Sequence, residues 1–180
     1  MRAVVRNLCP RSRGQPLRMR RAGLDGAVVT LLLCFDGSAA AAHAIRSAGS
    51  LFADRDAFVL SVAIPAKDEW PLDPVGDLVG RLSGLYREWD ELATELARRR
   101  AALGCRIAAE VGLHALPLVA AVTAAPTILR AAGEHDVNVI VMGTRGHRSS
   151  LSLGSVSAHV AQHAPHPVLI VSAPERNDAA

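Results

Sequence analysis

The stretch Val139-Ile140-Val141-Met142-Gly143-Thr144-Arg145-Gly146, continued by Leu153-Gly154-Ser155-Val156-Ser157, decides the fold of this chain. The apolar run at 139–142 indicates a buried strand. The two glycines that follow indicate a loop, and Gly154 with its two neighbouring serines indicates the start of a helix. Such a loop brings backbone N–H groups and a helix N-terminus onto one anion, usually a phosphate. We therefore treat this loop as the candidate functional centre.

Length and composition fit a single domain with a sizeable core. The chain has 180 residues, half of them hydrophobic, but only two Trp, one Tyr and three Phe, so the core consists of Ala, Val, Leu and Ile. No apolar run reaches the roughly 18–20 residues that a membrane span needs. The scattered cysteines Cys9, Cys34 and Cys105 favour a reducing cytoplasm without disulfides. We expect a cytoplasmic protein, with Cys34 in its core.

The positive charge is confined to the N-terminus. Residues 1–25 hold seven Arg against one Asp, which gives +6 there and leaves −3 for the rest of a chain of net charge +3. Residues 1–26 lack periodicity and contain Gly and Pro, so we expect a basic, disordered extension without a secretory signal. It is either a weak nucleic-acid or anionic-surface arm, or an unstructured segment from a start codon assigned too early. The dominance of Arg over Lys is typical of a GC-rich bacterial genome.

Apolar runs and helical periodicities alternate between residues 27 and 173. We expect strands at 27–35, 57–64, 116–123, 137–142 and 168–172, and helices at 38–53, 75–111, 126–135 and 155–163. This alternation predicts an α/β fold, a doubly wound, five-stranded, mainly parallel sheet with helices on both faces. Asp36 ends the first strand and the glycine loop ends the fourth, so both belong to the rim where such sheets bind ligands. Residues 174–180 form a frayed tail.

The long helix at 75–111 carries an apolar stripe. Its members are three and four residues apart: Val75, Leu78, Leu82, Leu85, Trp89, Leu92 and Leu96. Such a stripe either lies against the sheet, which is the commoner arrangement, or forms a coiled-coil seam. Gly104 suggests a bend in this helix, and Gly112 suggests its end.

With these residues placed, the chain resembles the universal stress proteins of the UspA family over residues 27–173. The resemblance rests on Val-Ile-Val-Met-Gly-Thr-Arg-Gly (139–146), Leu-Gly-Ser-Val-Ser (153–157), His-Ala-Pro-His-Pro-Val-Leu-Ile-Val (163–171) and Asp-Gly-Ser (36–38) in this order. It implies a Rossmann-like fold of the adenine-nucleotide-hydrolase type. It also implies a site for ATP or another adenine nucleotide, with Mg²⁺ as an optional companion ion.

The resemblance also nominates the residues of that site. Asp36 and Val62 would lie near the base or sugar, and Met142 and Gly143 would line the ribose. The phosphate would be held by Gly146, Gly154, Ser155, Val156 and Ser157. Glycine permits close approach of the backbone, the serines can donate hydroxyl hydrogen bonds, and a helix N-terminus favours negative charge. Arg145 and Arg148 either add charge-assisted contacts or extend into solvent.

One departure from the family pattern weakens this expectation. Seven residues separate Gly146 from Gly154, two fewer than in the nucleotide-binding motif. The shorter loop either binds with altered geometry, binds a diphosphate or monophosphate, or forms only a tight strand-to-helix turn. In the last case the chain would be a member that binds no nucleotide and acts as a dimeric interaction module.

The remaining constellations give no catalytic or metal site. His159, His163 and His166 are close in sequence, but no Cys or carboxylate joins them, so we expect surface histidines. The only lysine, Lys67, lies far from the glycine loop, which disfavours a P-loop NTPase. No residue is an evident water-positioning group, so we expect binding without efficient hydrolysis, with a slow ATP hydrolase as a further alternative.

The C-terminal strand is the expected partner surface. Members of the UspA family commonly pair through their final strand, and residues 167–171 are short and apolar enough to do so. The resemblance therefore implies a homodimer acting in the stress response. We expect no membrane partner and, apart from the Arg-rich extension, no nucleic acid.

Overall fold

The computed structural model describes residues 6–7, 29–65, 76, 78, 84–121, 123–144 and 153–172. The strands are β1 (Arg6–Asn7), β2 (Leu31–Cys34), β3 (Asp56–Ala63), β4 (His114–Ala121), β5 (Val139–Gly143) and β6 (Val168–Val171). The helices are α1 (Ala39–Leu51), α4 (Leu85–Glu110), α5 (Ala124–Glu134) and α6 (Ser155–His163). None of the helices in these ranges is long and apolar enough to cross a membrane.

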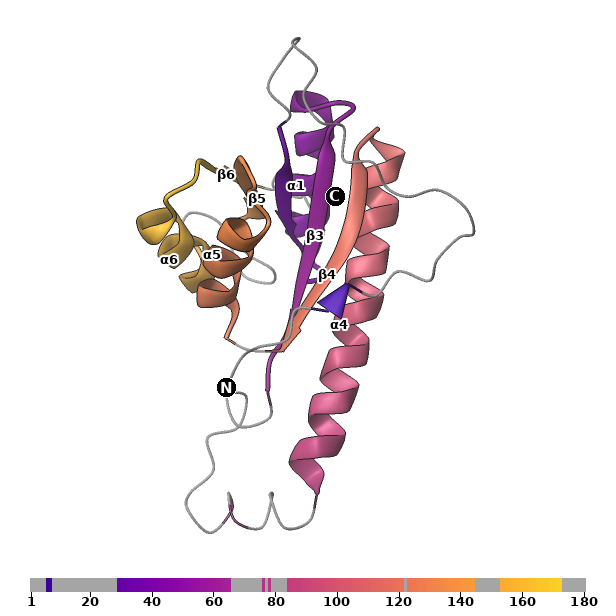
Figure 1. Cartoon of the computed structure of the whole chain (residues 1–180), viewed down its shortest axis with the longest axis vertical. Coiled ribbons are helices and arrows are strands. Elements are labelled where there is room, and N and C mark those ends of the chain that lie inside the picture. The colour runs from indigo at the N-terminus through magenta and orange to yellow at the C-terminus, as the bar shows by residue number, and fades with distance from the viewer. Residues whose placement is uncertain are drawn as a thin grey trace, which may run out of the picture.

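The strands form one sheet in the order β1-β4-β3-β2-β5-β6, in which β2 to β6 are parallel. Helices α1 and α4 cover one face, and α5 and α6 cover the other (Figure 1). This arrangement confirms the predicted doubly wound α/β fold. The element bounds differ from our expectation mainly at strand ends, where short loops continue the apolar pattern.

The core has two layers because β2 is buried on both faces. Leu31 and Leu33 are fully buried against α1 and α4, and Leu32 is fully buried against α5 and α6. Successive side chains of a strand point to opposite faces, so a continuous apolar run is what a central parallel strand requires. β2 is also where the chain changes direction across the sheet. β3 and β4 extend to one side of it and β5 and β6 to the other, so a ligand crevice is expected at the carboxyl ends of β2 and β5.

Strand β1 was not predicted. Arg6 and Asn7 pair antiparallel with Val119 and Leu118 of β4, so these two residues depart from the expectation of disorder. The edge of β4 offers unpaired backbone groups, and any extended segment can satisfy them whatever its side chains. The rest of the N-terminal extension and the C-terminal tail lie outside the described residues.

The apolar stripe of α4 does not lie against the sheet, and the commoner arrangement that we expected is wrong for its described part. Leu85, Leu92 and Leu96 are 57%, 53% and 41% exposed. The buried face consists mainly of small residues: Ala97, Ala101, Gly104, Ile107 and Ala108. Small side chains let the helix backbone approach the sheet closely, and that approach places the large leucines to one side.

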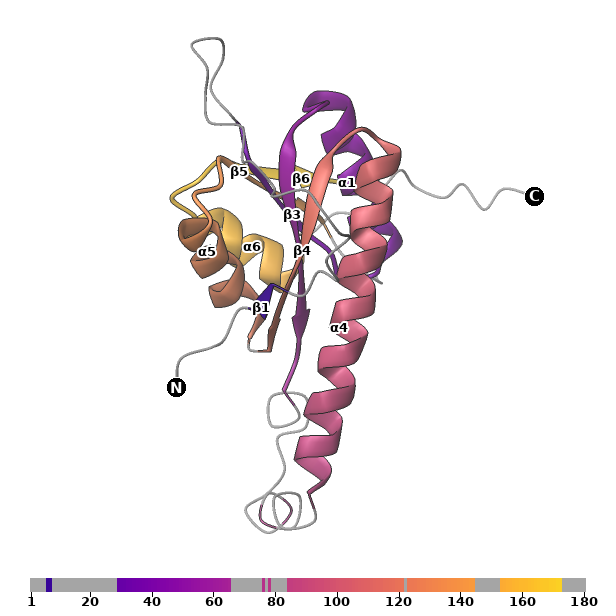
Figure 2. The same cartoon turned by 45° about the vertical axis from the view of Figure 1, so that its right-hand side comes forward.

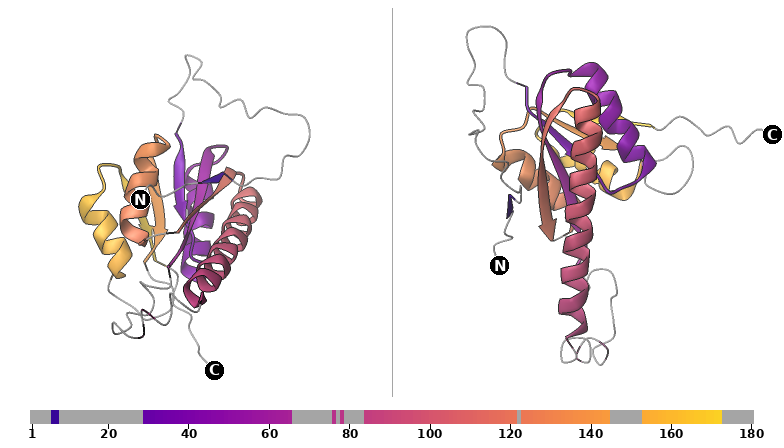
Figure 3. Two further views of the ribbon diagram at one scale, coloured as in Figure 1. Left: turned by 60° about the horizontal axis from the view of Figure 1, so that its bottom comes forward. Right: turned by 90° about the vertical axis from the view of Figure 1, so that its right-hand side faces the viewer.

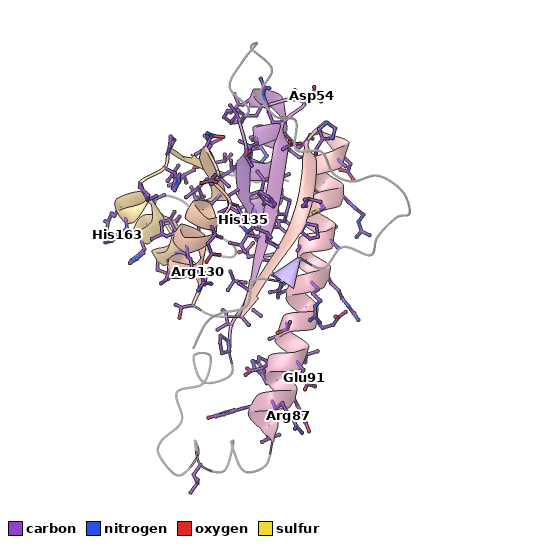
Figure 4. The ribbon with its side chains drawn as sticks, in the orientation of Figure 1. Asp54, Arg87, Glu91, Arg130, His135 and His163 are labelled. Atoms are coloured by element: carbon purple, nitrogen blue, oxygen red, sulfur yellow. The ribbon has the colours of Figure 1, made fainter. Side chains whose placement is uncertain are left out.

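Gly104 is needed for this approach and does not interrupt the helix. A Cβ atom at this position would lie 2.6 Å from Cγ1 of Val59 on β3. The N-terminal half of α4 extends past the carboxyl ends of the strands (Figures 2 and 3). Arg87 and Glu91 lie on this projecting part (Figure 4). Residues 75, 77, 79–83 and the predicted start of the helix lie outside the described residues.

Candidate functional site

The loop after β2 is held by its own side chains. The backbone N–H of Ser38 donates to Oδ1 of Asp36 (2.9 Å), and the N–H of Ala41 donates to Oγ of Ser38 (3.1 Å). Ser38 is thus the N-cap of α1, as predicted. Gly37 between them has φ +88°, which favours glycine. The second carboxylate oxygen of Asp36 remains available at the exposed rim of the sheet.

The end of β5 lies directly against the start of α1. A Cβ at Gly143 would be 2.9 Å from the carbonyl carbon of Ala40, so only glycine fits without moving α1. Beyond Gly143, the N–H of Gly154 donates to the carbonyl of Thr144 (2.9 Å). Although residues 145–152 lie outside the described part, this bond fixes the two ends of the loop beside each other.

The first turn of α6 presents unpaired backbone donors. Gly154 is the N-cap and provides no side-chain acceptor. The hydroxyl of buried Ser157 donates to the carbonyls of Gly154 (3.0 Å) and Thr144 (3.2 Å). Its hydroxyl is therefore used within the protein, so any contact of Ser157 with an anion is now expected from its backbone N–H. The N–H groups of Ser155, Val156 and Ser157 have no acceptor among the described residues, as is usual for a helix start open to an anion.

These loops surround one cavity of about 340 Å³ at the carboxyl ends of the central strands, within the roughly 300–1,000 Å³ range of small-molecule sites. Eight of the nine nominated residues line it: Asp36, Val62, Met142, Gly143, Gly154, Ser155, Val156 and Ser157. The ninth, Gly146, lies outside the described residues, as do Arg145 and Arg148. The structure thus brings the nominated residues together from four separate segments, and their roles as ligand contacts stay predictions.

Sequence reasoning missed most of the apolar wall of the cavity. The wall is completed by Leu60 of β3, by Ile64 directly after β3, and by Ala124 and Ile128 of α5. Ile64 is an exposed aliphatic side chain at the rim. Its position directly after a buried strand was the only available signal.

Two further residues of the cavity matter chemically. Cys34 lines the cavity and packs against the core cluster around Leu32 while staying partly accessible, so it belongs to the core as predicted. Burial, with a smaller contribution from the charge of Asp36, raises the pKa of the Cys34 thiol to about 12, which keeps it protonated and unreactive at neutral pH. Arg100, on α4, also lines the cavity, and nothing in its sequence context pointed to this position.

The histidines of α6 lie away from the cavity. The rings of His159 and His163 stack with centroids 4.2 Å apart, and Nδ1 of His163 is 2.8 Å from the carbonyl oxygen of His159. His163 lies on the outer side of α6 (Figure 4). Within the described ranges, no group of three His, Cys, Asp or Glu residues is arranged to hold a metal ion.

Comparison with known proteins identifies the family. The sequence profile of the universal stress protein family matches residues 29–172. The chain belongs to the universal stress protein family. The match spans all the parallel strands and the four helices around the cavity, as the sequence motifs predicted. No curated protein is significantly similar in sequence.

Solved universal stress proteins share the fold. UspA from Lactobacillus plantarum is 24% identical, with a TM-score of 0.56 over 82% of this chain and 99% of that chain. The Archaeoglobus fulgidus protein in complex with dAMP is 17% identical, with a TM-score of 0.53 over 80% and 97%. An Arabidopsis thaliana family protein with AMP bound is 13% identical, with a TM-score of 0.52 over 84% and 96%.

Proposed function

We propose that this universal stress protein binds an adenine nucleotide, ATP or a shorter form, in the cavity at the carboxyl ends of β2, β3 and β5. The observation that carries the proposal is the combination of two features in one cavity. An apolar wall lies beside a helix N-terminus whose first N–H groups have no acceptor among the described residues. Two solved relatives hold AMP and dAMP, which supports the same ligand class here.

The apolar wall suits the base. The side chains of Val62, Ile64 and Ile128 line the cavity and offer aliphatic surface to a flat aromatic ring. Asp36 stands at the rim with a free carboxylate oxygen, which can accept a hydrogen bond from a ribose hydroxyl. A cavity with this wall and one acceptor favours a nucleoside over a bare anion.

The start of α6 suits the phosphate. Unpaired N–H groups of Ser155 and Val156, the exposed hydroxyl of Ser155 and the partial positive charge of the helix end all favour an anion. The loop between Gly146 and Gly154 has seven residues, and a short loop surrounds fewer phosphate oxygens. We therefore expect AMP and ADP to bind at least as well as ATP.

Calorimetric titration with AMP, ADP and ATP tests the proposal. We expect saturable binding, and about tenfold weaker binding for Asp36→Asn, which keeps the acceptor for the N–H of Ser38 but loses the charge. The control is Asp56→Asn at the other end of β3, which should bind as the wild type does. No heat change at high micromolar nucleotide, with folded protein, would refute the proposal.

We further propose binding in the cytoplasm without efficient hydrolysis, with Mg²⁺ as an optional companion of a di- or triphosphate. Hydrolysis needs a group that positions water. Asp36 is the only acidic residue lining the cavity among the described residues, and its assigned partner is the ribose. A phosphate-release assay on the wild type and Asp36→Ala should give the same background for both.

The proposed ligand-responsive unit is a homodimer formed through β6. This strand lies at one end of the sheet, and its edge away from β5 pairs with no strand among the described residues. The carbonyl of Pro167 accepts a hydrogen bond from Ile140 of β5, and that of Val171 accepts one from Thr144, directly after β5. Because directions alternate along a strand, the backbone groups of Val168 and Ile170 point to the free edge. Light scattering should show a dimer at micromolar concentration, and Ile170→Pro, which removes one outward N–H, should weaken it. A wild-type monomer at 100-fold higher concentration would refute the dimer.

A second candidate function is an interaction module that binds no nucleotide. The exposed leucines of α4 favour it, because Leu85, Leu92 and Leu96 form an apolar stripe that no described element covers. A stripe of this kind suits a helix of another protein. Loss of a partner upon Leu92→Gln, together with absence of nucleotide binding, would favour this function over the first.

A further inference from the structure

The cavity contains one cation among its described lining residues, Arg100, and it comes from the opposite side of the sheet to α6. Helices α5 and α6 form one wall, whereas α1 and α4 flank the other. Of the lining residues that the structure describes, only Asp36 and Arg100 are charged. The phosphate charge proposed at the start of α6 would therefore face a guanidinium group across the cavity.

The position of Arg100 is fixed by the close packing of α4. Ala97 and Ala101 are fully buried on the helix face toward the sheet, and Gly104 leaves no room for a side chain beside Val59. These contacts set the rotation of the helix about its axis. They place residue 100 at the border of the buried face, next to the loop after β2.

The stem of Arg100 runs beside that loop. A Cβ atom added at Gly37 would lie 3.6 Å from Cγ, Cδ and Nε of Arg100, so the aliphatic part of the arginine passes the open side of the glycine with room for a methyl group between them. The stem is thereby guided along the rim of the cavity. Arginine stems commonly cover apolar surface in this way while the charged head stays hydrated.

The guanidinium group of Arg100 is not used elsewhere in the described structure. Its neighbours Arg98 and Arg99 both pair with Glu95, at 3.5 Å and 3.0 Å. Arg100 forms no ion pair with any described residue, and its side chain is exposed. A planar guanidinium with free N–H groups matches the oxygens of a phosphate in pairs.

We propose that Arg100 is a specificity-determining residue of this site, which contacts a phosphate of the bound nucleotide from the α4 side and selects nucleotides over nucleosides. The inference rests on the proposed nucleotide binding and adds to it a residue from outside the glycine loop.

The test compares ligands with and without phosphate. Adenosine, AMP and ADP are titrated into the full chain, Arg100→Gln, the conservative Arg100→Lys, and the matched control Arg99→Gln. Arg99 lies on the same helix, is 74% exposed and is not among the described residues that line the cavity. We expect Arg100→Gln to weaken AMP and ADP about tenfold, while adenosine changes less than about twofold. Arg100→Lys should recover part of the loss, and Arg99→Gln should behave as the wild type.

The outcomes separate this inference from the proposed function. If the wild type binds none of the three ligands, the proposed function fails and the inference fails with it. If the wild type binds AMP and Arg100→Gln keeps the same ratio of AMP to adenosine affinity, the inference alone is overturned. An equal loss for adenosine and AMP in Arg100→Gln also overturns it, because that result indicates a structural role for the stem on Gly37.

Discussion

Replacing Gly104 with alanine tests how α4 is held on the sheet. Two opposing effects act at this position. Alanine is favoured over glycine in a helix interior by about 1 kcal/mol. The new methyl group, however, would lie 2.6 Å from Cγ1 of Val59 and 3.1 Å from the ring of Phe35, and both residues are buried.

The steric effect should be the larger one. Val59 is fully buried in β3 between two parallel neighbours, so its methyl group cannot move away without displacing the sheet. Overpacking of this kind typically costs about 1–3 kcal/mol. After subtraction of the helix preference of about 1 kcal/mol, we expect Gly104→Ala to lower the free energy of unfolding by up to about 2 kcal/mol.

A second helical glycine supplies the control. Gly133 lies in α5, and a Cβ there meets nothing within 4 Å, so Gly133→Ala should raise the free energy of unfolding by about 0.5–1 kcal/mol. Chemical denaturation of each variant measures whether its free energy of unfolding rises or falls. If Gly104→Ala stabilises the protein as Gly133→Ala does, the close packing of α4 on β3 is refuted. The double variant with Val59→Ala should show coupling, because the smaller residue removes the clash.

Three further predictions concern the cavity wall and its helices. The pKa of Cys34 is raised from 9.0 to about 12, so the folded state keeps a proton that the unfolded state loses. This contribution to stability is complete below pH 9 and is lost as the pH rises toward 12. The free energy of unfolding, measured by denaturation at pH 8 and at pH 10, should therefore fall less between these two pH values for Cys34→Ala than for the wild type. Ser38→Ala removes the acceptor for the N–H of Ala41 and should lower the unfolding free energy by about 1 kcal/mol in the same assay; an unchanged value would contradict the cap. Leu92→Gln on the exposed stripe should change the free energy of unfolding by less than about 0.5 kcal/mol. Ala101→Leu on the buried face of α4 should lower it by about 1–3 kcal/mol. A larger drop in melting temperature for Leu92→Gln than for Ala101→Leu would contradict the assignment of the two faces.

The fold and most of the cavity could be predicted from the sequence because local signals there agree with the tertiary structure. The continuous apolar runs of β2 and β5 correspond to strands buried on both faces, and Ser38 is a cap in both sequence and structure. The rule that parallel strands share one carboxyl edge then placed Asp36 beside Gly143 without any contact information. The individual site residues were nominated by the resemblance to the universal stress proteins, and eight of the nine line one cavity.

The errors concern α4, where local and tertiary signals conflict. The periodicity predicted that the large leucines form the buried face. The face with small residues packs against the sheet instead, because Ala97, Ala101 and Gly104 permit a closer approach of the helix backbone. No pattern in one sequence reveals which of two adjacent helix faces is the closer fit. The same limitation concealed Arg100, whose place at the cavity depends on the rotation of that helix. Strand β1 was missed because backbone pairing at a sheet edge needs no side-chain pattern.

Helix α4 is anchored along only part of its length. At 26 residues it is about 39 Å long, yet its first buried residue is Ala97. Residues 85–96 precede this first buried residue, so we expect their backbone amides to exchange with solvent by local opening that leaves the core intact. Arg100 lies in the first turn of the anchored part. A ligand that holds Arg100 would restrain α4 where the projecting segment meets the anchored part, so we expect occupancy of the cavity to slow amide exchange in residues 85–96.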